Sequence, residues 1–440
     1  MKEEKEKKFK IVTLGCRTNQ YESQAYQDQL IALGYRAAQE GEQADICIVN
    51  TCTVTESADS SSRHAIRQLA RENAEAQLLV TGCFAERQPN VVKGMEARAH
   101  IVPNRDKDRL LAQIFPEEEL PEFSIKHFDC HTRAFVKIQD GCNSFCTYCI
   151  IPYVRGRSRS RTVEDIIQEV HSLIANGYKE IVLTGINIGD FDGGVEKGQE
   201  PVRLAELVRI IDQMPGLERL RISSIDPDEV DEDLADAVLN GKKTCHSMHI
   251  VLQSGSNVIL KRMNRKYTRQ IFLDTIERLR TADPDFTFTT DIIVGFPGET
   301  DVDFADTLEV MQQVKFAKVH MFPYSDRPRT RSALMPNKVA PAIIRERKQE
   351  VLRLSEQLAF DLRNQYVTRR MFVLTESKDP LRPHEISGHT ENFLAVWVQG
   401  ERFAANQLIE VELTSNTPDG LIGRPVSHPS HTGLSLYHGD

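Results

Sequence analysis

The chain has 440 residues, of which 40% are hydrophobic and 27% are charged, and its formal net charge is −9. This composition is typical of a globular protein with two to four domains, and the acidic balance argues against a uniformly basic nucleic-acid-binding protein. No apolar run is long enough to cross a membrane, and the charged N-terminal residues lack the apolar core of a signal peptide. We therefore expect a cytoplasmic protein without a membrane partner, in which cysteines are more often thiols or metal ligands than disulfides.

The first part of the chain predicts alternating strands and helices. Short apolar strands are expected at residues 11–14, 46–49 and 78–80, and a helix is expected at 20–33, ending before Gly34. This alternation predicts an α/β domain with a doubly wound parallel sheet.

A cysteine follows each of these three strands, namely Cys16, Cys52 and Cys83. Ligands bind at the carboxyl ends of the strands in open parallel sheets, so three thiols that are distant in sequence can meet there. We interpret them as a metal site. The alternative is that they are packed thiols without a role, which is our interpretation of Cys47, inside its strand, and the default for Cys130 and Cys245.

The most informative motif is a loop with the spacing C-x3-C-x2-C, formed by Cys142, Cys146 and Cys149. Three thiolates can hold three irons of a four-iron cluster and leave the fourth iron open, whereas four-cysteine clusters are closed. A structural zinc site normally takes four ligands in two separated pairs, and a disulfide would leave one of the three cysteines unpaired. The spacing therefore favours an open iron–sulfur cluster over zinc or a disulfide.

The central part of the chain predicts a longer series of strands and helices. Strands are expected at residues 134–138, 180–183, 219–222, 249–252, 287–294 and 318–322. Six βα units in line predict an open, partial TIM-type (βα)6 barrel, in which functional loops follow the strands. The polar and glycine-rich loops after these strands predict a small-molecule pocket.

The last part of the chain predicts a connecting helix at residues 341–363 and then short strands at 371–375, 393–398, 408–413 and 420–424. This pattern predicts a small all-β barrel or sandwich. We expect Phe393 and Trp397 to be core residues and the tail after Arg424 to be flexible.

Three segments of the chain are rich in arginine. The densest is 155–161, and the others lie at 261–269 and 327–331. Most charge runs are solvated faces, but three such segments beside predicted functional loops favour an anionic polymer as substrate.

Together these motifs resemble the radical S-adenosylmethionine enzymes, in which an aromatic residue, here Tyr148, precedes the last cysteine of the C-x3-C-x2-C loop. The N-terminal cysteine trio, the six-unit barrel and the terminal β region resemble the methylthiotransferases, which end in a TRAM domain. The resemblance covers most of the chain and implies a methylthiotransferase N-terminal domain at 8–120, a radical SAM core at 128–358 and a TRAM domain at 361–428.

Within that family, residues 13–23, 50–55 and 141–161 look most like the branch that modifies N6-threonylcarbamoyladenosine at position 37 of tRNA. The alternatives are the branches that modify isopentenyladenosine-37 or a ribosomal-protein aspartate. Two positions depart from the branch pattern: Thr18 replaces an apolar residue, and Arg329 stands where the family tends to have glycine.

The resemblance implies a radical insertion of a methylthio group at C2 of the adenine, with no catalytic residue beyond two [4Fe-4S] clusters. The implied cluster ligands are Cys16, Cys52 and Cys83, and Cys142, Cys146 and Cys149. The implied S-adenosylmethionine neighbours are Tyr148, Thr184, Gly185, Asn187, Ser223, Ser224 and Gln253. The implied contacts with the tRNA anticodon stem-loop are Arg155, Arg157, Arg159 and Arg161.

An electron donor such as flavodoxin or ferredoxin is also implied, as is a sulfur donor that the sequence does not identify. Two other classes of protein remain as alternatives. One is a two-cluster electron carrier that binds RNA without catalysis, and the other is a zinc-dependent RNA-binding protein.

Overall fold

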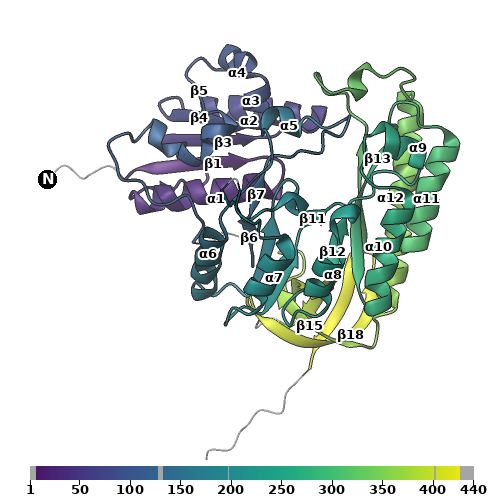
Figure 1. Cartoon of the computed structure of the whole chain (residues 1–440). Coiled ribbons are helices and arrows are strands. Elements are labelled where there is room, and N and C mark those ends of the chain that lie inside the picture. The colour runs from purple at the N-terminus through teal and green to yellow at the C-terminus, as the bar shows by residue number, and fades with distance from the viewer. Residues whose placement is uncertain (1–5, 127–131, 197, 401–402, 427–440) are drawn as a thin grey trace, which may run out of the picture.

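The computed structural model describes residues 6–126, 132–196, 198–400 and 403–426, and it is a mixed α/β structure with three parts (Figure 1). Cys130 and most of the tail after Arg424, for which the sequence predicts packing and flexibility, lie outside the described residues. Within the described ranges, no helix has the length and apolar character needed to span a membrane.

The N-terminal part is a parallel sheet with the strand order β2-β1-β3-β4-β5. Its strands are β1 (Lys8–Thr13), β2 (Arg36–Ala37), β3 (Ile46–Thr51), β4 (Gln77–Gly82) and β5 (His100–Ile101). Its helices are α1 (Arg17–Ala32), α2 (Glu56–Glu72), α3 (Cys83–Arg87) and α4 (Pro89–Met95), followed by the 3-10 turns η1 (Asn104–Arg109) and η2 (Leu111–Gln113). Two separate apolar clusters pack around this sheet, and its parallel strands confirm the predicted α/β alternation.

The central part contains parallel strands that follow one another in chain order. One sheet has the order β10-β9-β6 and the next has the order β11-β12-β13-β14, with a bridge between Leu220 and Thr244 beside their junction. The strands are β6 (Arg133–Lys137), β9 (Glu180–Thr184), β10 (Arg219–Ile222), β11 (Ser224–Ile225), β12 (Ser247–Ile250), β13 (Thr287–Val294) and β14 (Lys318–Pro323). All six predicted strands are present, although β12 begins and ends two residues earlier than expected.

Helices between these strands pack on them through one large apolar cluster that extends from β6 to α12. They are α6 (Val163–Ala175), α7 (Leu204–Asp212), α8 (Glu232–Leu239), α9 (Asn257–Arg262), α10 (Arg269–Ala282) and α11 (Asp301–Val314). Shorter elements are β7 (Gln139–Asp140), α5 (Ile151–Val154), β8 (Arg159–Ser160), η3 (Ile188–Asp190), η4 (Pro227–Glu229) and η5 (Ser332–Leu334). Within the described sheets, β6 and β14 each have only one strand neighbour, so the strand series is open between its first and last strands.

The long helix α12 (Pro341–Asn364) leads into a closed barrel with the order β15-β16-β17-β19-β18, drawn in yellow-green to yellow in Figure 1. The strands are β15 (Arg370–Thr375), β16 (Glu385–Thr390), β17 (Ala395–Gln399), β18 (Leu408–Thr417) and β19 (Gly420–Pro425). The barrel packs against the central part, where Arg219 donates to the carbonyls of His389 and Phe372 at 3.0 and 2.8 Å.

Two sequence predictions for this barrel are wrong. Strand β16 was missed, because Ile386 is the only aliphatic residue in its sequence EISGHT, which therefore shows no apolar run. Phe393 and Trp397 are half-buried instead of lying in the core. Phe393 stacks on His389 under two guanidiniums, and the guanidinium of Arg382 lies 4.3 Å from the ring centroid of Trp397.

Candidate functional site

The C-x3-C-x2-C loop follows β6 and β7, at the carboxyl end of the first central strand. Its three cysteines are free thiols, and the loop is anchored where the Thr147 hydroxyl donates to the carbonyl of Arg262 at 2.9 Å. Burial raises the pKa of the Cys142 and Cys149 thiols. Donors already face two of the sulfurs. The Ser144 amide lies 3.3 Å from Cys142 Sγ, and Arg265 Nη1 lies 2.9 Å from Cys146 Sγ.

Two adjoining cavities border this loop. One of about 210 Å³ includes all three loop cysteines in its wall, and the other has about 220 Å³. Both are lined by Tyr148, Cys149, Ile151, Gln253 and Asp291. The second cavity also reaches Val54 and Thr55 in the N-terminal part.

Four of the seven residues expected beside S-adenosylmethionine line these cavities, namely Tyr148, Asn187, Ser224 and Gln253. Thr184 and Ser223 are buried at strand ends and are not on either wall. Gly185 is also absent from the walls. A Cβ there would lie 2.9 Å from Ile188 and 3.0 Å from the Gln139 carbonyl, so this glycine permits close packing behind the cavity.

The second trio lies at the carboxyl ends of three neighbouring strands, as the sequence predicts. Cys16 precedes α1, Cys52 follows β3, and Cys83 follows β4. The strand order changes direction between β1 and β3, and open α/β sheets bind ligands at such a switch point. Cys52 and Cys83 are buried and Cys16 is exposed. Burial, together with the neighbouring thiols of Cys83 and Cys16, raises the pKa of Cys52 to about 11.

The two trios are joined by α5, the short helix that follows Cys149. Cys83 packs against Ile150 and Val154 of this segment. At the end of α5, Arg155 Nη2 donates to Asn19 Oδ1 at 2.5 Å. The amide nitrogen of Asn19 donates in turn to the carbonyls of Leu14 and Thr51, at the ends of the two strands that precede Cys16 and Cys52.

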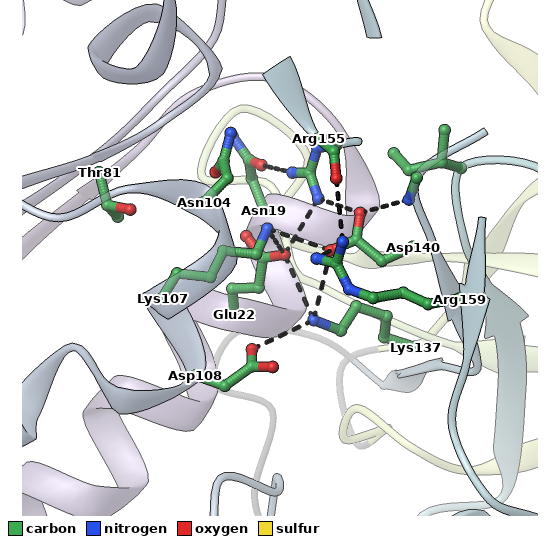
Figure 2. Close-up of polar contacts among 12 residues, drawn as sticks. Asn19, Glu22, Thr81, Asn104, Lys107, Asp108, Lys137, Asp140, Arg155 and Arg159 are labelled. Carbon is green, nitrogen blue, oxygen red and sulfur yellow. Dashed lines mark hydrogen bonds and ion pairs between the residues drawn. The ribbon is translucent and has the colours of Figure 1, made fainter. Parts of the chain in front are cut away.

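Arg155 is also the centre of a buried network of charges between the N-terminal and central parts (Figure 2). Its Nη1 atom lies 2.8 Å from Asp140 Oδ1 and 3.2 Å from Glu22 Oε1. Lys107 pairs with Glu22, and it lies 3.4 Å from Asp140. Burial by itself would raise the pKa of Glu22, but the cations Lys107, Arg155 and Lys137 lower it to about 2.

Comparison with known proteins places this architecture in a family. Residues 136–311 match the Radical SAM superfamily, and residues 8–103 match a family described as uncharacterized protein family UPF0004. The threonylcarbamoyladenosine tRNA methylthiotransferase MtaB of Chlamydia pneumoniae is 47% identical over 423 residues, covering 95% of this chain and 98% of that protein.

This chain belongs to the radical SAM methylthiotransferase family.

Other methylthiotransferases are also similar over their full length. The MtaB protein of Bacillus subtilis is 35% identical, covering 91% of this chain and 92% of that protein. A tRNA-2-methylthio-N(6)-dimethylallyladenosine synthase of Alkaliphilus oremlandii is 33% identical, covering 93% of this chain and 90% of that protein.

Among solved structures, the radical S-adenosylmethionine methyltransferase TsrM from Kitasatospora setae is similar in fold. It has a TM-score of 0.57 and 12% identity, with coverage of 88% of this chain and 92% of that chain. A second structure of that enzyme, with cobalamin and a [4Fe-4S] cluster bound, has a TM-score of 0.54 and 13% identity, with coverage of 75% and 77%.

Membership of the radical SAM superfamily implies a [4Fe-4S] cluster and S-adenosylmethionine, and the residues of this methylthiotransferase fit both groups. The loop supplies three free thiols with donors facing two of the sulfurs. Gln253 has a left-handed backbone with φ of 64°, and its buried Oε1 atom has no hydrogen-bond partner among the described residues. That acceptor borders both cavities, where a bound ligand can satisfy it.

The chemistry of the donor set also fits a cluster at the N-terminal trio. A Cβ added at Gly15, which has φ of 97°, would lie 2.8 Å from Cys52 Sγ, so glycine keeps the space beside that thiol free. In the described ranges, no three His, Cys, Asp or Glu side chains converge on a point that could hold one metal ion.

The expected RNA-contact arginines of this methylthiotransferase fall into two groups, and the prediction for Arg155 is wrong. Arg155 is 3% exposed and is engaged by Glu22 and Asp140, so RNA cannot reach it in this structure. Arg161 is partly buried and pairs with Glu169 at 2.5 Å. Arg157 and Arg159 are exposed.

The sequence also did not predict the contacts of Arg265 and Arg327, which lie in the other two arginine-rich segments. Arg265 faces Cys146 and pairs with Asp226. Arg327 is buried against the N-terminal part, where it pairs with Asp59 at 2.8 Å. The position of Arg265 after α9 and of Arg327 after β14 could have indicated a role near the site. A run of charged residues alone does not distinguish a buried arginine from a solvated one.

Proposed function

We propose that this chain is a tRNA-modifying enzyme that inserts a methylthio group at C2 of N6-threonylcarbamoyladenosine at position 37, beside the anticodon. The observation that carries the proposal is the cavity that borders Cys149 of the loop and Thr55, three residues after Cys52. A substrate base in that space is accessible from both cysteine trios. The 47% identical relative that is named for this nucleoside supports the choice of base.

In this proposal, Cys142, Cys146 and Cys149 hold one [4Fe-4S] cluster, and Cys16, Cys52 and Cys83 hold a second. When bound, the first cluster with S-adenosylmethionine supplies a radical able to remove hydrogen from an unactivated carbon, and the second supplies the sulfur site. Arg265 and the Ser144 amide stabilise the thiolates of the loop by charge-assisted hydrogen bonds. Arg155 places a cation beside Cys83 and opposes the rise in its pKa that burial causes.

In this proposal, side chains around the loop orient bound S-adenosylmethionine. Tyr148, Asn187, Ser224 and Gln253 line the space beside the loop, and Gln253 offers an unpaired carbonyl oxygen to a donor on the ligand. Thr184, Gly185 and Ser223 support this wall from behind. Asn187 is itself held in place because its side-chain amide donates to Glu229 at 2.9 Å.

We propose the domain boundaries 8–120, 128–358 and 361–428, with an open (βα)6 barrel as the core and a TRAM domain formed by β15 to β19. The boundary near residue 360 falls inside α12, which continues to Asn364. Arg157 and Arg159 are the proposed contacts with the anticodon stem-loop, and flavodoxin or ferredoxin is the proposed electron donor. A tRNA substrate fits the cytoplasmic location that the sequence predicts.

The second candidate is the same reaction on an adenosine with an N6-dimethylallyl group. The relatives named for that nucleoside support it at 31% to 33% identity, below the 47% and 35% of those named for threonylcarbamoyladenosine.

The test is nucleoside mass spectrometry of tRNA from cells that lack the gene, with and without the gene restored. We expect the 2-methylthio form of threonylcarbamoyladenosine to appear only with the gene, and the dimethylallyl nucleosides to stay unchanged. Methylthiolation of the dimethylallyl nucleoside instead would reverse the assignment.

A further inference from the structure

Arg17, the first residue of α1, directly follows Cys16 and projects from the N-terminal part towards the central barrel. Its guanidinium lies 5.3 Å from the ring centroid of Phe135 on β6. Arg17 is also near enough to His320, on β14, for its charge to contribute, after burial and His249, to the lowered pKa of that imidazole. Arg17 is therefore close to both the first and the last strand of the open series.

Arg17 differs from the two other guanidiniums around it. Arg133 pairs with Glu376 at 3.1 Å, and Arg221 pairs with Glu180 at 2.8 Å. Arg17 makes no hydrogen bond or ion pair with any residue that the structure describes, although Glu180 and Asp291 are near enough to raise its pKa.

The side chain of Arg17 is accessible but surrounded by protein. It is exposed to solvent, and its guanidinium lies against the buried ring of Phe135, with the charges of Arg133 and Arg221 nearby. It is therefore an accessible cation without an anionic partner among the described residues. A guanidinium in this state can form charge-assisted hydrogen bonds with a bound anion.

A carboxylate is the anion that best matches a guanidinium, because two parallel hydrogen bonds can form. Asp291, which is within electrostatic reach of Arg17, also lines both cavities beside the cysteine loop. A base that leaves its stack can enter such a space, while its phosphates stay outside. The threonyl group on N6 of the proposed substrate ends in a carboxylate, and a dimethylallyl group carries no charge.

We propose that Arg17 binds the threonine carboxylate of the substrate base and so selects threonylcarbamoyladenosine over adenosines with uncharged N6 groups. The inference rests on the proposed function. A site that pairs a charged group of the protein with a charged group of the substrate discriminates against analogues that lack the charge, because the protein group is then left without its partner.

The test measures the binding of two anticodon stem-loops, one with threonylcarbamoyladenosine at position 37 and one with plain adenosine, to the anaerobic holoenzyme without reductant. We expect the wild type to bind the modified stem-loop more tightly, and Arg17→Met to weaken that binding by about tenfold or more while leaving the plain stem-loop unchanged. Arg17→Lys keeps the charge and should retain part of the preference. Arg105→Met, whose side chain is 84% exposed, is the control.

The two stem-loops distinguish recognition of the threonine carboxylate from a contact with the phosphates. Equal weakening of both stem-loops by Arg17→Met would make Arg17 a phosphate contact and overturn the inference, as would an unchanged preference. Iron content and melting temperature, measured for every variant, verify that the protein is folded and loaded. If the wild type binds the modified stem-loop but methylthiolates only dimethylallyl tRNA, the proposed function fails independently of Arg17.

Discussion

Arg155 shows most clearly how one residue connects the two cysteine trios. It follows the loop trio in sequence, and through Asn19 it holds the strand ends that carry Cys16 and Cys52 (Figure 2). A cation in this position compensates two buried carboxylates, Glu22 and Asp140, whose charges would otherwise be costly to bury.

Replacing this cation should destabilise the fold strongly. We expect Arg155→Met to lower the free energy of unfolding by about 3–5 kcal/mol, because two buried carboxylates lose a partner. Urea denaturation of the full chain measures this effect. Arg159→Met is the matched control. Its side chain is 45% exposed and contacts the same Asp140, so a loss of only about 0–1 kcal/mol is expected. Equal losses in the two variants would refute the network.

Glu22 should make stability depend on acid pH. Its pKa of about 2 in the folded protein is below the value of about 4.3 in an unfolded chain. A lowered pKa stabilises the fold above the unfolded value, and this stabilisation is lost as pH falls from about 4.3 towards 2. Over that window the wild type should lose about 3 kcal/mol more than Glu22→Gln. Parallel stability curves for the two proteins, recorded by urea denaturation at each pH, would contradict this prediction.

At the scale of elements, segment 155–161 combines two tasks that the sequence cannot separate. Its first and last arginines stabilise the junction between the parts, and its middle arginines face solvent. Arg157 also lies 4.4 Å from the ring centroid of Phe145 in the cysteine loop. Binding of RNA at this segment would therefore be adjacent to the loop cluster.

Within segment 155–161, the two exposed residues Arg157 and Arg159 should determine the affinity for RNA. We expect Arg157→Ala combined with Arg159→Ala to weaken tRNA binding and to reduce the slope of affinity against salt by about 1–2, since two phosphate contacts are lost. A salt titration of binding measures the slope. Arg382→Ala is a control on the C-terminal barrel. An unchanged slope in the double variant would remove this segment from the RNA-binding surface.

Features that depend on local sequence could be predicted from the sequence, whereas features that depend on distant residues could not. The strands that precede Cys16, Cys52 and Cys83 have apolar runs and parallel neighbours, so the position of the trio followed from sheet geometry alone. The burial of Arg155 could not be predicted, because its partner Glu22 is 133 residues away. Arg329 illustrates local information instead. It has φ of 77°, and a left-handed backbone explains why the family tends to have glycine there.

At the scale of the whole molecule, buried side-chain contacts join the N-terminal part to the central part. Arg155 contacts Glu22 and Asn19, and Arg327 pairs with Asp59. The cavity that includes Thr55 and Cys149 lies at this junction. Methylthiolation needs a radical and a sulfur source beside one carbon atom, and the proposed clusters on the two trios would supply them on either side of this junction.

The central claim is that each cysteine trio holds its own four-iron cluster. Anaerobic counting of iron and sulfide tests it most directly, on the wild type, on the Cys142/Cys146/Cys149 triple alanine variant and on the Cys16/Cys52/Cys83 triple alanine variant. The account predicts about eight irons in the wild type and about four in each variant. A wild type with about four irons, all lost with the loop cysteines, would contradict it, as would a colourless protein that contains zinc.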